Sequence, residues 1–408
     1  MGTYISLLHS CKYGDTQAAL EFLKNPKMCN LGEVDSNGRT PLIFACKNKM
    51  TSVALKILKW PNKCKLGNIN YKGWSALMYT CKKGMRSVAL EILKYPYRCG
   101  IGYTDPVWGD ELILACRNKM SQVAMEILKY HTKYPLYRSD RRGYTALMYT
   151  CINGMTKVAS KILEYHQGHT KTYKPSYLIV ACNHGMIDIA LEILKYHNRW
   201  KLDYVVGGDT ALTVACRKGM TNVAMKILEH PYICKLDHIA NNHTALTIAC
   251  SNSMTEVAME ILKYPYICKL DHVVNNHTAL TLACLNRMTV VAMKILEYHD
   301  KCKLDHIANN HTALTLACSN SMTEVAMKIL EYPYICKLDH IGDYTNTALT
   351  SACSKGMAQV ALEILKYPNI CNIDYLTTAT MQSLTYSDNM TEVANIMRKH
   401  SAKCPPAM

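Results

Sequence analysis

One short stretch decides the fold: Gly38-Arg39-Thr40-Pro41-Leu42-Ile43-Phe44-Ala45-Cys46. Variants of this stretch recur along the 408-residue chain, each with a Leu four residues before a Cys. The cysteines of these copies are Cys11, Cys46, Cys81, Cys116, Cys151, Cys182, Cys216, Cys250, Cys284, Cys318 and Cys353. Tyr386 takes this place in a twelfth unit. The steps between the cysteines are 34 or 35 residues, apart from one of 31. A period of this length over the whole chain predicts a repeat array.

Each unit is expected to form two short helices. The first begins at an N-capping Thr, such as Thr40 or Thr244, and runs through Leu-x-x-Ala-Cys. The second covers an apolar block such as residues 325–330, Val-Ala-Met-Lys-Ile-Leu. The next unit begins after a connector of about 16 residues that is rich in turn formers. The pattern therefore predicts helical hairpins joined by looped tips.

Two motifs carry a resemblance to a known family. Residues 38–46 resemble the G-x-T-P-L-H-x-A-A signature of ankyrin repeats, and residues 84–93 resemble the family's G-H-x-x-V-V-x-x-L-L. The resemblance covers essentially the whole chain. It implies an all-α repeat solenoid of about twelve helix-turn-helix units with β-hairpin or loop connectors. It also implies a scaffold for protein–protein interaction. The tetratricopeptide repeat shares the period, but the long Pro- and Asn-rich connector argues against its tightly joined helices.

The low glycine content and the Ala-Cys and Met substitutions are most similar to ankyrin arrays of giant amoeba-infecting DNA viruses. That similarity implies a viral protein with a host protein as its partner. Two departures from the family pattern lead to further expectations. Lys49, Ser253 and Arg287 stand where other units have the Gly that ends the first helix, so these helices should end less sharply. The 31-residue step leaves a connector at 169–175 that predicts an irregular turn or a kink.

We predict a single array over residues 1–404. Its parts are an N-terminal capping unit at 1–36, basic repeats at 37–172, an irregular junction at 173–204, near-identical neutral repeats at 205–374, a C-terminal capping unit at 375–404, and a tail at 405–408. Polar residues such as Ser10 and Gln382 replace core residues of the end units, as expected for caps. Caps at both ends predict a monomer.

The chain has 20 cysteines, and we interpret them as buried thiols. Equivalent positions in packed helices lie about 8–10 Å apart, which is too far for a ladder of disulfides. His238, His272 and His306 follow a Cys in a Cys-x3-His-x4-His pattern, but the cysteines should face the core and the histidines the solvent. No catalytic motif is visible. We therefore predict no enzyme, no catalytic residue, no cofactor and no metal.

No apolar run is long enough to cross a membrane, and residues 1–4 do not begin a secretory signal. Together with the many cysteines, this favours an intracellular, reducing compartment, which is the host cytoplasm if the chain is viral, and argues against secretion and a membrane partner.

Charge is the sharpest functional signal. Residues 1–200 contain 29 Lys and Arg against 13 Asp and Glu, whereas residues 201–408 contain 18 of each. Many of the excess cations stand at the ends of first helices or at connector tips. The candidate partner-binding residues are Lys12, Lys47, Lys49, Lys82, Lys83, Arg117 and Lys119 at helix ends, and Arg39, Lys72, Arg141 and Arg142 at tips.

In ankyrin-like stacks these positions line the concave face, so the resemblance implies a protein partner with an acidic surface. Sequence-independent binding of nucleic acid or another polyanion by the same stripe is the alternative. A third interpretation is that the cations only complement helix dipoles and keep the array in solution. The sequence leaves these possibilities open.

Overall fold

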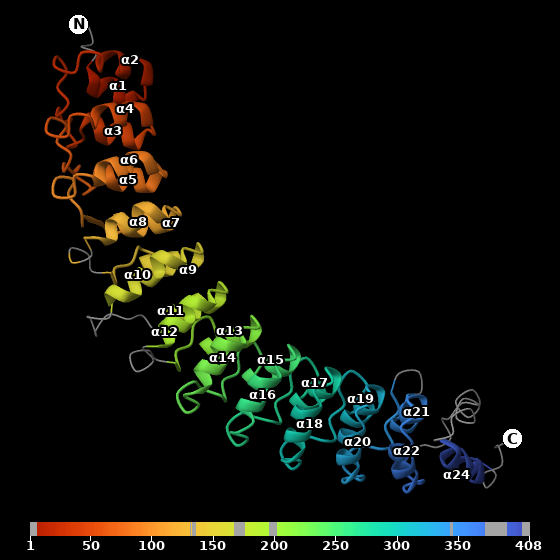
Figure 1. The fold of residues 1–408 in the computed structure, drawn as a ribbon. Coiled ribbons are helices and arrows are strands. Elements are labelled where there is room, and N and C mark those ends of the chain that lie inside the picture. The colour runs from red at the N-terminus through yellow and green to blue at the C-terminus, as the bar shows by residue number, and fades with distance from the viewer. Residues whose placement is uncertain are drawn as a thin grey trace. The chain divides into compact units, whose positions relative to one another are not determined.

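The computed structural model describes residues 6–130, 132, 136–166, 176–195, 202–342, 346–371 and 390–401. The regular structure of these residues consists almost entirely of short helices in pairs, joined by long connectors (Figure 1). The chain divides into two compact units, Met1–Lys201 (unit 1) and Leu202–Met408 (unit 2). None of the described helices is long and apolar enough to span a bilayer.

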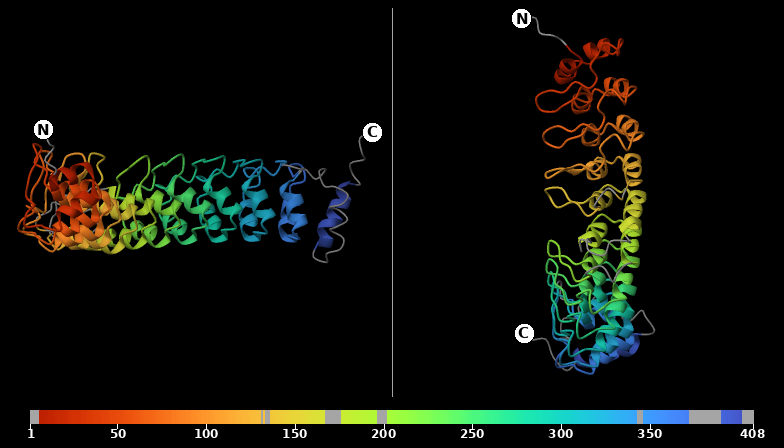
Figure 2. Two further views of the ribbon diagram at one scale, coloured as in Figure 1. Left: turned by 90° about the horizontal axis from the view of Figure 1, so that it is seen from above. Right: turned by 90° about the vertical axis from the view of Figure 1, so that its left-hand side faces the viewer.

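Unit 1 stacks its helix pairs in chain order. Its first helices are α1 (Leu7–Tyr13), α3 (Pro41–Lys47), α5 (Ala76–Lys83), α7 (Glu111–Arg117), α9 (Ala146–Ile152) and α11 (Ser176–Asn183). Its second helices are α2 (Thr16–Phe22), α4 (Thr51–Ile57), α6 (Arg86–Leu93), α8 (Ser121–Leu128), α10 (Thr156–His166) and α12 (Ile187–Leu194). Each first helix packs on the next first helix, and each second helix on the next second helix. The connectors extend to one side of the pairs (Figure 2).

Unit 2 repeats this arrangement. Its first helices are α13 (Ala211–Arg217), α15 (Ala245–Ser251), α17 (Ala279–Leu285), α19 (Ala313–Ser319) and α21 (Ala348–Ser354). Its second helices are α14 (Thr221–Leu228), α16 (Thr255–Ile261), α18 (Thr289–Leu296), α20 (Thr323–Leu330) and α22 (Ala358–Leu365), followed by α24 (Thr391–Ser401).

The first helices begin at polar caps and bury small apolar residues. Thr40 Oγ1 accepts a hydrogen bond from Ile43 N at 3.2 Å, and Asp110 caps α7 in the same way. In unit 2 each capping Thr is joined by a second Thr three residues later, and the pair forms a reciprocal capping box. The Ala and Cys that end the repeated stretch, such as Ala45 and Cys46, are fully buried. Close helix packing therefore depends on these small side chains.

Most connectors are looped tips with little strand. One tip forms a two-stranded antiparallel ribbon, β1 (Thr104–Asp105) with β2 (Gly109–Asp110), and several others contain single β-bridges. Neighbouring tips are hydrogen-bonded, as from Tyr71 N to Asn37 O at 3.1 Å. The connectors thus form a second stacked layer beside the helices.

The expectation that first helices end less sharply without Gly is wrong. Lys49, Ser253 and Arg287 have φ values of 58°, 54° and 55°, in the same left-handed region as Gly219 at 65°. The expected irregular connector at 169–175 lies outside the described residues, as does Gln382. Ser10, expected on a polar end face, is buried.

Candidate partner-binding surface

A register of cations marks the first helices of unit 1. The residue directly after the first-helix Cys is Lys12, Lys47, Lys82 or Arg117 in four successive repeats, and we call these four residues the cation column. They stand in the last turns of α1, α3, α5 and α7, and each of these helices packs on the next. The four side chains therefore follow one another along one side of unit 1.

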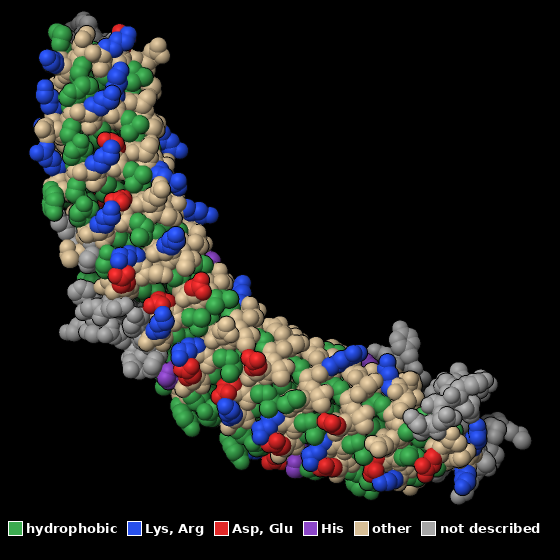
Figure 3. Space-filling model, in the orientation of Figure 1, with side chains coloured by type: hydrophobic (Ala, Val, Ile, Leu, Met, Phe, Trp, Pro, Cys, Tyr) green, Lys and Arg blue, Asp and Glu red, His purple; other side chains and the backbone are tan. Residues whose placement is uncertain are grey.

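Within the described ranges, the cation column has no carboxylate at salt-bridge distance, nor do Lys49, Lys83 and Lys119. On the second helices, by contrast, Lys94 and Lys129 contact Glu91 and Glu126 at 2.7 and 2.8 Å. On the face seen in Figure 3, cations also dominate the surface of α1–α8, whereas acidic and basic side chains alternate over α14–α22. Unpaired charge alone thus does not single out the column.

Shared aromatic rings distinguish two members of the column, Lys82 and Arg117. The Lys82 Nζ lies 3.7 Å from the ring centroid of Trp108 and 4.8 Å from that of Trp74. The Arg117 Cζ lies 4.9 Å from the Trp108 centroid and 5.9 Å from that of Tyr149. We call these five residues the aromatic–cation cluster. It spans α5, α7 and α9, so three repeats contribute to one surface.

Carboxylates fix the rings of this cluster. Trp74 Nε1 donates to Asp105 Oδ2 at 2.7 Å, and the Tyr149 hydroxyl donates to Asp140 Oδ2 at 2.6 Å. The other oxygen of each carboxylate accepts backbone N–H groups of its own turn, such as Trp108 N at 2.8 Å. Burial and the neighbouring Asp140 raise the pKa of Tyr149 to about 12, so its hydroxyl stays a donor. The acidic groups nearest the cluster are therefore already occupied.

The cluster is electropositive. Burial lowers the pKa of Lys82, and the charges of Lys83 and Arg117 lower it further, while Asp105 acts in the opposite direction. Lys47, Lys82, Lys83 and Arg117 are half-buried. An anion placed beside these cations would relieve their mutual repulsion.

The remaining predicted residues differ among themselves. Lys12, Lys49 and Lys119 are exposed at helix ends, and Lys72, Arg141 and Arg142 are exposed at tips. Arg39 is held within its own turn.

Arg39 forms a 2.7 Å ion pair with Asp35, and its side chain is only 19% exposed. Its guanidinium also lies 4.6 Å from the Phe44 ring centroid. Ten of the eleven predicted cations are thus at least partly exposed without a carboxylate partner among the described residues, whereas Arg39 stabilises its own turn.

Comparison with known proteins agrees with this architecture. Residues 7–105 match the model of the family described as ankyrin repeats (3 copies). The fold is an ankyrin-type all-α repeat solenoid. No curated protein matches the sequence.

Two ladders of the ankyrin-type stack were not foreseen from the sequence. Asn48, Asn118 and Asn153 donate from Nδ2 to the carbonyl of the first-helix Cys in the preceding repeat, at 2.8–2.9 Å. In unit 2, Asn252, Asn286 and Asn320 make the same bond at 2.9–3.0 Å. We call this the Asn ladder. It gives a second hydrogen bond to a helix-end carbonyl that already accepts the backbone N–H three residues later, as from Gly84 N to Cys81 O at 3.4 Å. An Asn two residues after the Cys is its signal.

The second ladder lies at the tips of unit 2. His238, His272, His306 and His340 donate from Nε2 to a backbone carbonyl of the preceding tip, at 2.8–3.0 Å. Within the described part of the chain, no three His, Cys, Asp or Glu side chains converge as a metal site. The tip histidines therefore join neighbouring repeats.

The thiols lie in the core of the ankyrin-type units. All 19 described cysteines are free, and most are fully buried. Burial raises the pKa of Cys11 and Cys216 to about 12, so these thiols are poor nucleophiles.

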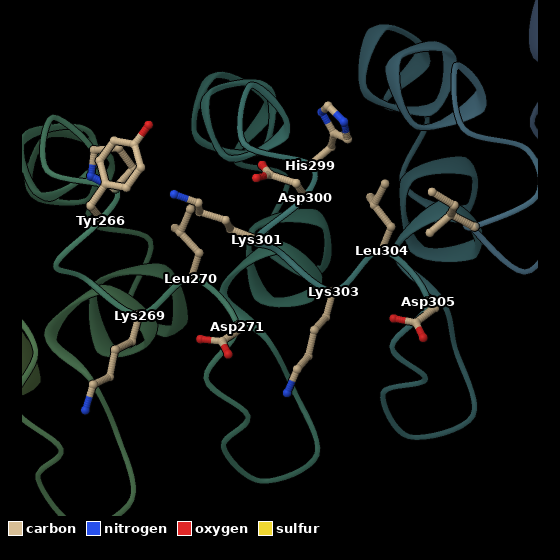
Figure 4. Close-up of a pocket in the computed structure, with 12 residues that line it drawn as sticks. Tyr266, Lys269, Leu270, Asp271, His299, Asp300, Lys301, Lys303, Leu304 and Asp305 are labelled. Atoms are coloured by element: carbon tan, nitrogen blue, oxygen red, sulfur yellow. The ribbon is translucent and has the colours of Figure 1, made fainter.

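A groove on unit 2 is less suited to a charged partner. It has a volume of about 880 Å³ and lies between connectors that follow second helices (Figure 4). Lys269, Lys301 and Lys303 face it together with Asp271, Asp300 and Asp305. Lys301 Nζ lies 3.4 Å from the Tyr266 ring centroid. The alternating charges cancel, so the groove has no strong preference for an anion or a cation.

Proposed function

We propose that this chain is a non-enzymatic scaffold that binds a protein with an acidic surface through the helix-one side of unit 1. The observation that carries the proposal is the cation column, which lacks carboxylate partners and leads into the aromatic–cation cluster. Trp and Arg are among the residues most often found at the energetic centres of protein interfaces, and Trp108 and Arg117 are only half-buried. This side would correspond to the concave partner surface implied by the resemblance.

A polyanion such as nucleic acid is the second candidate. The same cations could neutralise phosphates, and aromatic rings can stack on bases. Trp74 and Tyr149 are almost fully buried, however, which limits the ring surface open to a base. This observation favours the protein partner.

The setting of the interaction is also part of the proposal. Many free buried thiols suit a reducing, intracellular compartment. The resemblance to arrays of giant DNA viruses suggests a viral protein with a host protein as its partner. We further propose that the chain acts as a monomer.

Affinity capture from amoebal host lysate, with and without nuclease, tests the proposal. One variant changes Lys47, Lys82, Lys83, Arg117 and Lys119 to Glu. A control of equal charge changes five exposed cations outside the proposed surface to Glu: Lys59, Lys63, Arg86, Arg98 and Lys157. We expect a nuclease-resistant protein partner that is lost only in the first variant. Recovery of nucleic acid alone would favour the polyanion, and equal loss in both variants would contradict the assigned surface.

A further inference from the structure

The spacing of the cation column restricts the shape of what it can bind. Lys12, Lys47, Lys82 and Arg117 occupy one register on successive packed helices. Packed helices lie about 8–10 Å apart, so the column offers one cation at roughly each such step. Lys82 and Arg117 set an upper limit on one step, because their charged groups lie 3.7 and 4.9 Å from the same Trp108 centroid and so are no farther apart than the sum, which falls near the lower end of this range.

A polyproline II segment has a matching repeat. It has three residues per turn and rises about 3.1 Å per residue, so every third side chain lies on one face at steps of about 9 Å. A β-strand alternates its side chains, and those on one face are about 7 Å apart. The spacing of carboxylates on a β-strand is therefore shorter than that of the cations, so the two rows no longer match after one or two repeats.

The surroundings of the column favour such a segment. Polyproline II peptides dock on grooves lined by aromatic rings, and the half-buried Trp108 contacts both Lys82 and Arg117. Asp105 and Asp140 already accept hydrogen bonds from Trp74 and Tyr149, so the carboxylates that the cations lack must come from the partner.

We infer that the cation column binds an extended acidic peptide segment in the polyproline II conformation, with an acidic residue at every third position. The inference rests on the proposed function and deepens it. Four cations correspond to acidic residues at positions i, i+3, i+6 and i+9, which is a segment of about ten residues. Ile152 and Asn183 take the same position in the next two repeats, so the register of charge ends there.

The test uses the full chain and labelled peptides in fluorescence anisotropy at about 0.1 M salt. The probe peptide contains four copies of Glu-Pro-Ala, and the control has the same composition with its four Glu residues in one block. We expect the spaced peptide to bind at least about tenfold more tightly. Lys82→Gln and Arg117→Gln should each reduce this preference several-fold, whereas Lys59→Gln, outside the column, should not.

The outcomes separate the two proposals. Equal affinity for both peptides, lost in the column variants, would overturn the spacing inference and leave the acidic partner intact. Tighter binding of a helical peptide with Glu at every seventh residue would also overturn it. A duplex DNA that binds more tightly than either peptide would contradict the proposed function as well.

Discussion

Units 1 and 2 share the same core residues but differ at the position directly after the first-helix Cys, a row of side chains that we call the ridge. The residue after the first-helix Cys is a cation in four repeats of unit 1, but Ser251, Leu285, Ser319 and Ser354 in unit 2. Arg217 is the exception in unit 2, and it is paired with Asp209. The comparison shows that the same repeat can hold its core fixed while this ridge changes from charged to neutral.

The residue before the helix-one cap also differs between repeats of the two units. Trp74 and Tyr144 take this place in two repeats of unit 1, where Trp74 belongs to the aromatic–cation cluster. His243, His277 and His311 take it in three repeats of unit 2, at the tips that the histidine ladder joins. Within these repeats, unit 1 thus places an aromatic ring where unit 2 places a histidine.

The largest expected effect tests whether the cores are equivalent. Leu77→Ala in unit 1 and Leu280→Ala in unit 2 each remove a fully buried side chain from the same position. Each should lower the free energy of unfolding of its unit by about 2–5 kcal/mol. Hydrogen exchange followed by mass spectrometry measures both units. A loss in one unit only would break the equivalence.

The next effect tests the difference between the ridges. Lys47→Gln, Lys82→Gln and Arg117→Gln together should weaken binding of the acidic partner about 100-fold. Adding Ser251→Lys, Leu285→Lys and Ser319→Lys to that variant should not restore it, because unit 2 lacks the aromatic–cation cluster. Isothermal titration measures both changes. Full restoration would show that charge alone suffices.

The Asn ladder should matter equally in both units. Asn118→Ala and Asn286→Ala each remove the side-chain hydrogen bond between two repeats and leave the carbonyl with only its backbone partner, so each should cost about 1 kcal/mol of stability. Chemical denaturation followed by circular dichroism measures the loss. Lys355→Asn supplies the missing side chain in its repeat and should stabilise the chain. Destabilisation by Lys355→Asn would contradict the role given to the ladder.

Acid should affect unit 2 more than unit 1. Burial lowers the pKa of His243, with Arg217 adding to the effect, and burial also lowers that of His277, together with His306 and His311. The unfolded chain then binds more protons, so unit 2 loses stability as the pH falls through about 6.5. Hydrogen exchange corrected for pH measures this loss. His243→Gln with His277→Gln should flatten the profile, and an unchanged profile would exclude these groups.

The smallest effect concerns the left-handed residue after the first helix. Ser321 has a φ of 58°, whereas Gly356 has 65° at the equivalent position. Ser321→Gly should stabilise the chain by about 0.5–1 kcal/mol, because Gly adopts this conformation without strain. Gly219→Ser should cost a similar amount. The midpoint of urea denaturation measures both, and a loss on Ser321→Gly would show that another contact of Ser321 dominates.

The sequence predicted the fold because its signals are local and repeated. A capping Thr, a buried Leu, Ala and Cys, and a period of about 34 residues define the helix pairs without knowledge of their packing. The helix ends were predicted wrongly at Lys49 and Ser253, since the absence of Gly suggested fraying. The backbone there turns as it does at Gly219, and the same local hydrogen bond closes the turn in each case, as from Met50 N to Ala45 O at 2.8 Å.

The candidate surface could be predicted only in part. The charges of Lys47, Lys82 and Arg117 are visible in the sequence, but their contacts with rings are not. Trp108 comes from one tip and meets Lys82 and Arg117 from two different helices. Only the stacking of repeats places them together. The pairing of Arg39 with Asp35, four residues apart, could have been found from the turn itself.

The interruptions of the Asn ladder have a mechanical consequence. Lys83, His184, Lys218 and Lys355 replace the Asn in their repeats, so these repeats lack the side-chain bond that the others make. Stability in such arrays is a sum over neighbouring repeats, and a weaker joint lowers only its own contribution. Under a pulling force, for instance when a protease complex unfolds the protein, neighbouring repeats that lack the ladder bond should separate first. The ladder would then determine how many repeats unfold together.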